Sequence, residues 1–203
     1  MILGAVVAGY LFGTFPSADL VARIATRGTV DIRAVGTGNP GTLNAMRSIG
    51  TKWGIVVLVL DVVKGSGAAV FGAWIGGADG AYAAATAAIA GHIFPVWTRF
   101  KGGKGVATSA GACIAVFPLY FPLDAAVAYL SAVKSQRATL GTQVGCAIWV
   151  SASVLWWAFE WPNLWGPKPG AGLVAFSVVG SAMILWAFWH GNRELARKAA
   201  AEQ

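Results

Sequence analysis

The chain has 203 residues, of which 57% are hydrophobic and only 11% are charged, and its formal net charge is +7. A soluble domain usually has about a quarter of its residues charged, so this composition excludes most soluble enzymes and free nucleic-acid-binding proteins. The fifteen Lys and Arg residues stand in short groups between apolar segments, which is typical of signals that orient membrane helices. Cys113 and Cys146 both lie in apolar segments and are expected to be buried thiols.

Apolar segments long enough to cross a bilayer follow one another along the chain. Because about 20 helical residues span a hydrocarbon core of about 30 Å, the sequence predicts spanning helices over residues 1–24, 53–77, 79–98, 142–159 and 171–190. We expect the first to be retained, since no basic residue precedes the apolar run and the run outlasts a signal peptide. Trp161 and Trp165 follow residues 142–159, as in an interfacial aromatic belt.

The segment from Val106 to Val133 is interrupted by Pro118 and Pro122. If it were one span, Lys134 and Arg137 would lie across the membrane from the basic residues that precede the segment, against the positive-inside rule. A turn at the two prolines places both groups of charges on one side. The sequence therefore predicts two short or re-entrant helices here.

With the N-terminus outside, this topology collects the basic residues on the cytoplasmic side. Thirteen of the fifteen fall there, namely Arg23, Arg27, Arg33, Arg47, Lys52, Arg99, Lys101, Lys104, Lys134, Arg137, Arg193, Arg197 and Lys198. The sequence thus predicts an all-α integral membrane protein of about seven transmembrane or re-entrant helices. It forms one domain over residues 1–203, with the C-terminus cytoplasmic.

The first candidate segment for chemistry runs from Asp31 to Arg47. Its glycines allow backbone N–H groups to approach an oxyanion, its small polar side chains add neutral donors, and Arg47 adds a bidentate cation. The candidate binding residues are Gly36, Thr37, Gly38, Asn39, Asn44 and Arg47. A helix beginning near Thr42 would direct its positive end to the same place. The alternative is a flexible polar turn.

The second candidate segment runs from Arg99 to Thr108, directly before a predicted helix N-terminus. Its glycines permit a nest of N–H groups for a phosphate, its lysines supply charge, and the helix adds its dipole. The candidate residues are Lys101, Gly102, Gly103, Lys104, Gly105 and Thr108. The spacing is not that of a Walker A motif, so nucleotide hydrolysis is not predicted. The alternative is a loop that only anchors a span to anionic headgroups.

The third candidate segment, residues 190–194, lies where the last span meets the cytosol, although its histidine could be merely interfacial. Within the spans, Asp61 and Lys64 stand at i and i+3 and are expected to form a structural pair. His92 fits a hydrogen-bonding strut better than a base, and Asp19 lies near enough to the cytoplasmic end to reach water. Two glycine-rich anion loops at the rim of a membrane bundle suit a substrate with phosphate heads and an apolar tail.

Several stretches together resemble one protein family. They are Phe15-Pro16-Ser17, Asp31-Ile32-Arg33 with Val35-Gly36-Thr37-Gly38-Asn39, and Gly91-His92-Ile93-Phe94-Pro95-Val96 with Phe100-Lys101-Gly102-Gly103-Lys104-Gly105-Val106-Ala107-Thr108. In this order they are similar to the acyl-phosphate-dependent glycerol 3-phosphate acyltransferases of bacteria (PlsY type). The resemblance implies a seven-helix inner-membrane enzyme, with its active site facing the cytoplasm, that moves a fatty acyl group from acyl phosphate to the 1-hydroxyl of glycerol 3-phosphate and yields lysophosphatidic acid and phosphate.

The resemblance also implies roles for particular residues. The motif serine of the family falls on Thr37 and its motif arginine on Arg47, Asn39 and Asn44 match, and the phosphate loop from Lys101 to Gly105 is intact. The Ser-Leu motif falls on Thr139-Leu140, and Leu43 stands where a Thr is usual. His190 matches the C-terminal histidine of the family, which is followed three residues later by Asn. Here Arg193 stands at that position and Asn192 just before it, so Asn192 replaces the asparagine only if the alignment slips by one residue.

As a mechanism, Lys104, Arg47 and the glycine N–H groups would hold the two phosphates, while Thr37 and Asn39 donate to the developing oxyanion. The base would be His190 or a phosphate oxygen of the substrate. No cofactor or metal is expected, because neither loop has two carboxylates close enough to chelate a cation. A soluble acyl-phosphate synthase is a candidate partner on the basic face.

Two other hypotheses stay open. An anion transporter would also use basic loops and broken helices, but it predicts matching broken helices in two halves, whereas only one segment is interrupted by prolines. A family member that has lost catalysis could act as a membrane scaffold. The departures at Thr37, Leu43 and the C-terminal motif favour this hypothesis, whereas the intact phosphate loop argues against it.

Overall fold

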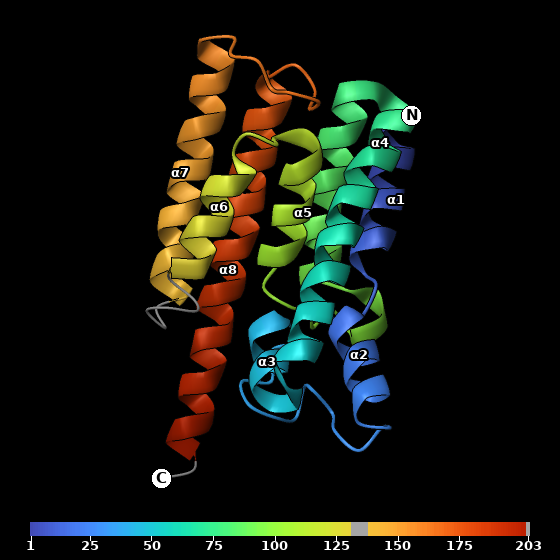
Figure 1. Ribbon diagram of the computed structural model, residues 1–203, viewed down its shortest axis with the longest axis vertical. Coiled ribbons are helices and arrows are strands. Elements are labelled where there is room, and N and C mark those ends of the chain that lie inside the picture. The colour runs from blue at the N-terminus through green and yellow to red at the C-terminus, as the bar shows by residue number, and fades with distance from the viewer. Residues whose placement is uncertain (131–137, 202–203) are drawn as a thin grey trace.

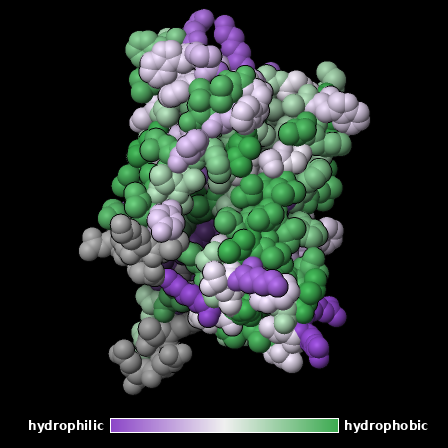
Figure 2. All heavy atoms as spheres, in the orientation of Figure 1, coloured by the Kyte–Doolittle hydropathy of each residue, from purple (hydrophilic) through white to green (hydrophobic). Residues whose placement is uncertain are grey.

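The computed structural model describes residues 1–130 and 138–201, which form helices joined by short connections and include no strand (Figure 1). Within these residues, four segments are long and apolar enough to cross a membrane, namely Ile2–Ala25, Thr51–Thr98, Ala138–Ala158 and Ala171–Arg197. The predicted all-α class is confirmed. Apolar side chains cover the middle of the surface, and hydrophilic ones gather toward its two ends (Figure 2).

The first predicted span is a broken helix. Helix α1 (Ile2–Gly13) and helix α2 (Ser17–Ala25) are separated at Pro16, which has no N–H and restricts the backbone of the residue before it. Close packing fixes α1 against α4. A Cβ at Gly9 or Gly13 would overlap the backbone of Ala84 or Ala88, so the two helices touch backbone to backbone.

Helix α4 (Thr51–Ile93) contains two spans joined by a tight turn. Gly76 and Gly77 leave the helical conformation there, and Gly77 has φ 61° and ψ −147°, a conformation that favours glycine. The two predicted spans over 53–77 and 79–98 are therefore confirmed as separate passes. Figure 1 shows them side by side with α1.

The second pass ends earlier than predicted, at Ile93 instead of residue 98. Pro95 disfavours a helical conformation in the residue before it, and a short 3-10 helix, η1 (Val96–Thr98), follows. At the same end of the molecule lies α3 (Thr42–Ile49), which begins where the sequence predicts a helix.

The segment with two prolines folds as a hairpin of short helices, as predicted. Helix α5 (Val106–Val116) and helix α6 (Phe121–Ala128) are joined by a turn whose Tyr120 hydroxyl donates to the Gly145 carbonyl at 2.9 Å. Lys134 and Arg137, whose charges support this prediction, lie outside the described residues.

Helices α7 (Ala138–Ala158) and α8 (Ala171–Ala201) pack beside the hairpin. The structure contains the span predicted over residues 171–190, and α8 continues beyond it to Ala201, because most of the later residues, above all Ala, Arg, Leu and Lys, favour helix. The predicted burial of Cys113 and Cys146 as free thiols is confirmed.

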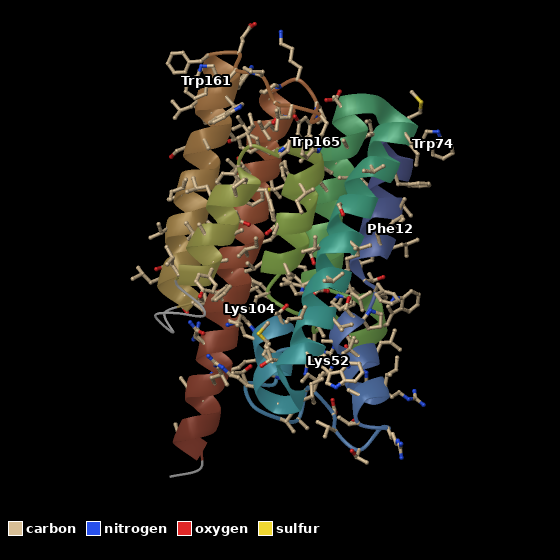
Figure 3. All side chains as sticks on the ribbon, viewed as in Figure 1. Phe12, Lys52, Trp74, Lys104, Trp161 and Trp165 are labelled. Carbon is tan, nitrogen blue, oxygen red and sulfur yellow. The ribbon has the colours of Figure 1, made fainter. Side chains whose placement is uncertain are left out.

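The two ends of the bundle differ in chemistry. The N-terminus, the turn within α4 and the connection between α7 and α8 lie at one end, and α2, α3 and the last turns of α8 lie at the other (Figure 1). Trp74, Trp161 and Trp165 lie toward the first end, whereas Lys52 and Lys104 lie toward the second (Figure 3). The candidate substrate groups therefore gather at the end that holds α2 and α3.

Candidate active site

The connection between α2 and α3 is folded around the side chain of Asn44. This amide is 3% exposed, and its Nδ2 donates to the carbonyls of Ile32 at 3.0 Å and Val35 at 3.2 Å. Its Oδ1 accepts from the backbone N–H of Thr37 at 2.9 Å. The hydrogen bonds of Asn44 therefore hold the loop, and its binding of substrate stays a prediction.

Other N–H groups of this loop are also engaged. The N–H of Gly38 donates to the Val35 carbonyl at 3.0 Å, and the N–H of Asn39 donates to Thr37 Oγ1 at 3.4 Å. Gly36 and Gly38 have φ of 58° and 68°, so they shape the turn. These N–H groups are thus engaged within the loop, and the nest of N–H groups for an oxyanion stays a prediction. The exposed hydroxyl of Thr37 and the half-buried amide of Asn39 remain as candidate donors.

The glycine-lysine loop is packed against the end of α4, and its N–H groups are likewise engaged by carbonyls of the protein itself. The N–H of Gly102 donates to the Ile93 carbonyl at 3.0 Å, and that of Gly103 donates to the His92 carbonyl at 3.1 Å. A Cβ at Gly102 would overlap those two carbonyls, and one at Gly103 would overlap the His92 ring. In this structure both N–H groups are engaged with the end of α4 and the glycines allow the close approach of two backbones, while their binding of phosphate stays a prediction.

Lys104 and the first turn of α5 remain as candidate anion-binding elements of this loop. Gly105, with φ 83°, precedes α5, whose first N–H groups have no acceptor within the helix. The Lys104 ammonium lies 4.1 Å from the centre of the Phe188 ring on α8. Of the carboxylates in the described part of the chain, none lies within ion-pair distance of it. Figure 3 places Lys104 beside α8, where Figure 2 shows the surface hollowed.

Burial lowers the pKa of the Lys104 ammonium, because the half-buried charge loses part of its hydration. A bound anion would oppose this effect and favour the charged form. Lys104 is therefore a cation whose surroundings suit a phosphate better than water alone.

Arg33 joins the two loops, although sequence reasoning alone does not identify it as part of the site. Its Nε and Nη2 donate to the two carboxylate oxygens of Asp19 on α2, at 2.5 and 2.8 Å. Its Nη1 donates to the carbonyl of Lys101 at 2.5 Å. A planar guanidinium can make these three bonds at once, so the pair fixes the start of the glycine-lysine loop.

The predicted histidine lies on the exposed side of α8. Its ring is stacked on Trp186 with the centres 5.0 Å apart, and its Nδ1 lies 3.9 Å from Glu194 Oε1, beyond hydrogen-bond distance. Trp186 in turn packs against Phe94 at the end of α4, 5.0 Å between ring centres. These contacts orient His190, while its role as a base stays a prediction.

Two further predicted residues of α7 and α8 meet each other. Asn192 Nδ2 donates to Thr139 Oγ1 at 3.2 Å, so the start of α7 is held against α8. The guanidinium of Arg193 lies 4.6 Å from a Trp189 ring centre, an arrangement of the cation–π type. Asn192 and Arg193 therefore lie on the exposed end of α8.

Of the other predicted residues, Thr108 departs most from expectation. It is fully buried in α5, where its carbonyl lies against Gly65 of α4. Its place between two helices makes it a packing residue, and its binding of substrate stays a prediction. Arg47, in the last turn of α3, and Lys101 are both exposed.

Comparison with known proteins decides which kind of protein carries this arrangement. Residues 3–198 match the family model described as glycerol-3-phosphate acyltransferase. The chain belongs to this family. The glycerol-3-phosphate acyltransferase of Rhodopseudomonas palustris (strain BisB5) is 38% identical over 159 residues, which cover 76% of this chain and 77% of that protein. The enzyme of Brucella suis (strain ATCC 23445 / NCTC 10510) is 45% identical over 114 residues, which cover 56% and 55%.

Crystal structures of PlsY, an integral membrane glycerol 3-phosphate acyltransferase, share the fold. The glycerol 3-phosphate form has a TM-score of 0.71 at 28% identity and covers 97% of this chain and 92% of that chain. The lysophosphatidic acid form has a TM-score of 0.72 at 26% identity with the same coverage. The predicted resemblance is confirmed, and the chain is a multi-pass membrane acyltransferase.

Within this acyltransferase, Arg33→Lys is expected to lower kcat/KM by about tenfold, because a single ammonium cannot bridge Asp19 and the Lys101 carbonyl together. Steady-state assays of the variant in detergent would measure the loss. Arg23→Lys is the matched control, since Arg23 is exposed in the last turn of α2, the helix that also carries Asp19. Equal activities of the two variants would show that the bridge does not hold the loop in a productive place.

Proposed function

We propose that this acyltransferase moves a fatty acyl group from an acyl phosphate to the 1-hydroxyl of sn-glycerol 3-phosphate. The hydroxyl oxygen bonds to the acyl carbon, the bond between that carbon and the phosphate oxygen breaks, and the hydroxyl proton passes to a phosphate oxygen or to His190. The products are lysophosphatidic acid and inorganic phosphate. The observation that carries the proposal is the half-buried Lys104 beside the first turn of α5, without a carboxylate partner among the described residues.

An acyl phosphate is already an activated anhydride, so the protein mainly has to align the two substrates and neutralise charge. Lys104 and the first turn of α5 would hold one phosphate, and Arg47 the other. The hydroxyl of Thr37 accepts from the Asn39 N–H, which leaves its own hydrogen for the oxyanion that forms on the acyl carbonyl. Asn39 would donate its amide to the same oxygen.

The charge distribution supports an active site that faces the cytoplasm of a bacterial inner membrane. Arg23, Arg33 and Lys52 lie on or beside α2, α3 and the start of α4, at the end opposite the N-terminus. Basic residues are retained on the cytoplasmic side of membrane proteins. A soluble acyl-phosphate synthase would meet this basic end directly.

The proposal is tested by giving the purified protein glycerol 3-phosphate with palmitoyl phosphate or with palmitoyl-CoA. We expect lysophosphatidic acid and phosphate to form with the acyl phosphate alone. Turnover with palmitoyl-CoA alone would show that the donor is wrong. No turnover with either donor, from protein that is folded by circular dichroism, would leave the hypothesis of a scaffold that has lost catalysis.

A further inference from the structure

Three ionisable side chains lie buried behind the glycine-lysine loop. Lys64 Nζ is 2.8 Å from Asp61 Oδ1, and His92 Nδ1 is 3.6 Å from the same oxygen. Their residues are only 6%, 2% and 8% exposed. Ionisable groups within a membrane bundle are costly to bury, so this cluster indicates a function that apolar residues would not supply.

The cluster touches two parts of the chain that must be placed together. Lys64 Nζ donates to the Phe15 carbonyl at 3.0 Å, where the broken helix passes from α1 to α2. On the other side, the His92 carbonyl accepts from the Gly103 N–H at 3.1 Å, and the ring lies so close that a Cβ at Gly103 would overlap its Nε2. A pocket beside the cluster is lined by these groups and by Ser17, whose buried hydroxyl has no hydrogen-bond partner among the described residues.

We propose that His92, held by the Asp61–Lys64 pair, is a positioning residue that fixes the backbone of Gly103 and thereby places Lys104 on the substrate phosphate. Gly103 directly precedes Lys104, and α5 begins two residues later. A displacement of about 1 Å in a substrate-holding group is enough to cost about 100-fold in rate. The proposal rests on the proposed function, because it supposes that Lys104 holds a phosphate.

The two edges of the imidazole have separate tasks. Nδ1 faces Asp61, and Nε2 faces Gly103. An asparagine at position 92 keeps a polar amide on the side of Asp61, but it leaves open the space that Nε2 fills. A methyl group at position 103 should therefore be harmful beside His92 and tolerated beside an asparagine.

A double-mutant cycle tests this coupling. We expect Gly103→Ala to lower kcat/KM by about 100-fold and His92→Asn by about tenfold, while the double variant regains about tenfold over Gly103→Ala. The losses should include a higher KM for glycerol 3-phosphate or for the acyl phosphate. Independent effects that simply multiply in the double variant, or a His92→Asn protein with the kinetics of the wild type, would overturn the proposal.

Ser153→Ala supplies a control for effects on folding alone. Ser153 is buried and lies 2.7 Å from Ser177 between α7 and α8, outside the contacts of the loop. This variant should lower the thermal unfolding temperature without a change in KM. The increase in that temperature on addition of inorganic phosphate is measured for all variants as well. If the wild type turns over neither donor, the proposed function fails, yet a loss of this phosphate effect in Gly103→Ala and its return in the double variant would still support positioning.

Discussion

Replacing Lys104 with methionine is expected to lower kcat/KM by about 100- to 1,000-fold, because the developing charge on a transferring phosphate loses its nearest preorganised cation. The ammonium lies over the Phe188 ring, and none of the described carboxylates pairs with it, so its charge is available to a substrate. Methionine keeps most of the apolar stem that packs against Gly191 and Phe188. The substitution should thus remove the charge and leave the packing.

Stability distinguishes this effect from unfolding. Removal of a partly buried charge that has no acidic partner should leave the thermal unfolding temperature unchanged or raise it slightly. The measurement is lysophosphatidic acid production together with thermal unfolding in the same detergent. A Lys104→Met protein that is folded and keeps the activity of the wild type would contradict the assignment of Lys104 to the phosphate.

The pH dependence of the wild type gives a second check on the same residue. Because burial lowers the pKa of Lys104, its charge is lost at a lower pH than that of an exposed lysine. kcat/KM should therefore fall as the pH rises through this lowered pKa, and kcat should fall only at higher pH, because bound phosphate stabilises the ammonium. Lys104→Arg keeps its charge throughout, so its residual activity should lack the alkaline fall.

The positions of the membrane spans follow from the sequence because they depend on the length and apolar character of single segments. Apolar length defines the spans, and the prolines at 118 and 122 with the nearby charges identify the α5–α6 hairpin. The start of α3 at Thr42 also follows from the sequence, since a glycine precedes it and small polar residues favour helix starts. The pair of Asp61 and Lys64 follows from their spacing on one helix face.

The acceptors of the loop N–H groups could not be predicted from the sequence. A glycine-rich loop has the same sequence whether its N–H groups face a ligand or a neighbouring carbonyl, and here Gly102 and Gly103 face the end of α4. Arg33 donates to a carbonyl 68 residues away, and no local pattern predicts such a contact. The sequence places Asn44 among the substrate-binding candidates because an amide can bind a substrate or hold a loop equally well. Only the folded loop shows that its Nδ2 and Oδ1 make hydrogen bonds to the backbone.

Gly102→Ala is expected to lower kcat/KM by about 100-fold or more, by moving the loop that carries Lys104. The added Cβ would lie 2.6 Å from both the Ile93 carbonyl oxygen and Pro95 Cδ. These atoms belong to a helix end and a proline ring, which cannot move aside as a flexible side chain can. Overpacking of this kind typically costs about 1–3 kcal/mol, so the thermal unfolding temperature should fall as well.

Gly170→Ala is the matched control for Gly102→Ala. A Cβ at Gly170, in the connection between α7 and α8, would have no heavy atom within 4 Å, so its activity and unfolding temperature should match those of the wild type. If both alanine variants were fully active, the close approach of Gly102 to α4 would not be needed for catalysis. Loss of activity in Gly102→Ala alone, with the protein still folded, would show that the glycines of this loop act by bringing two backbones together rather than by presenting N–H groups to the phosphate.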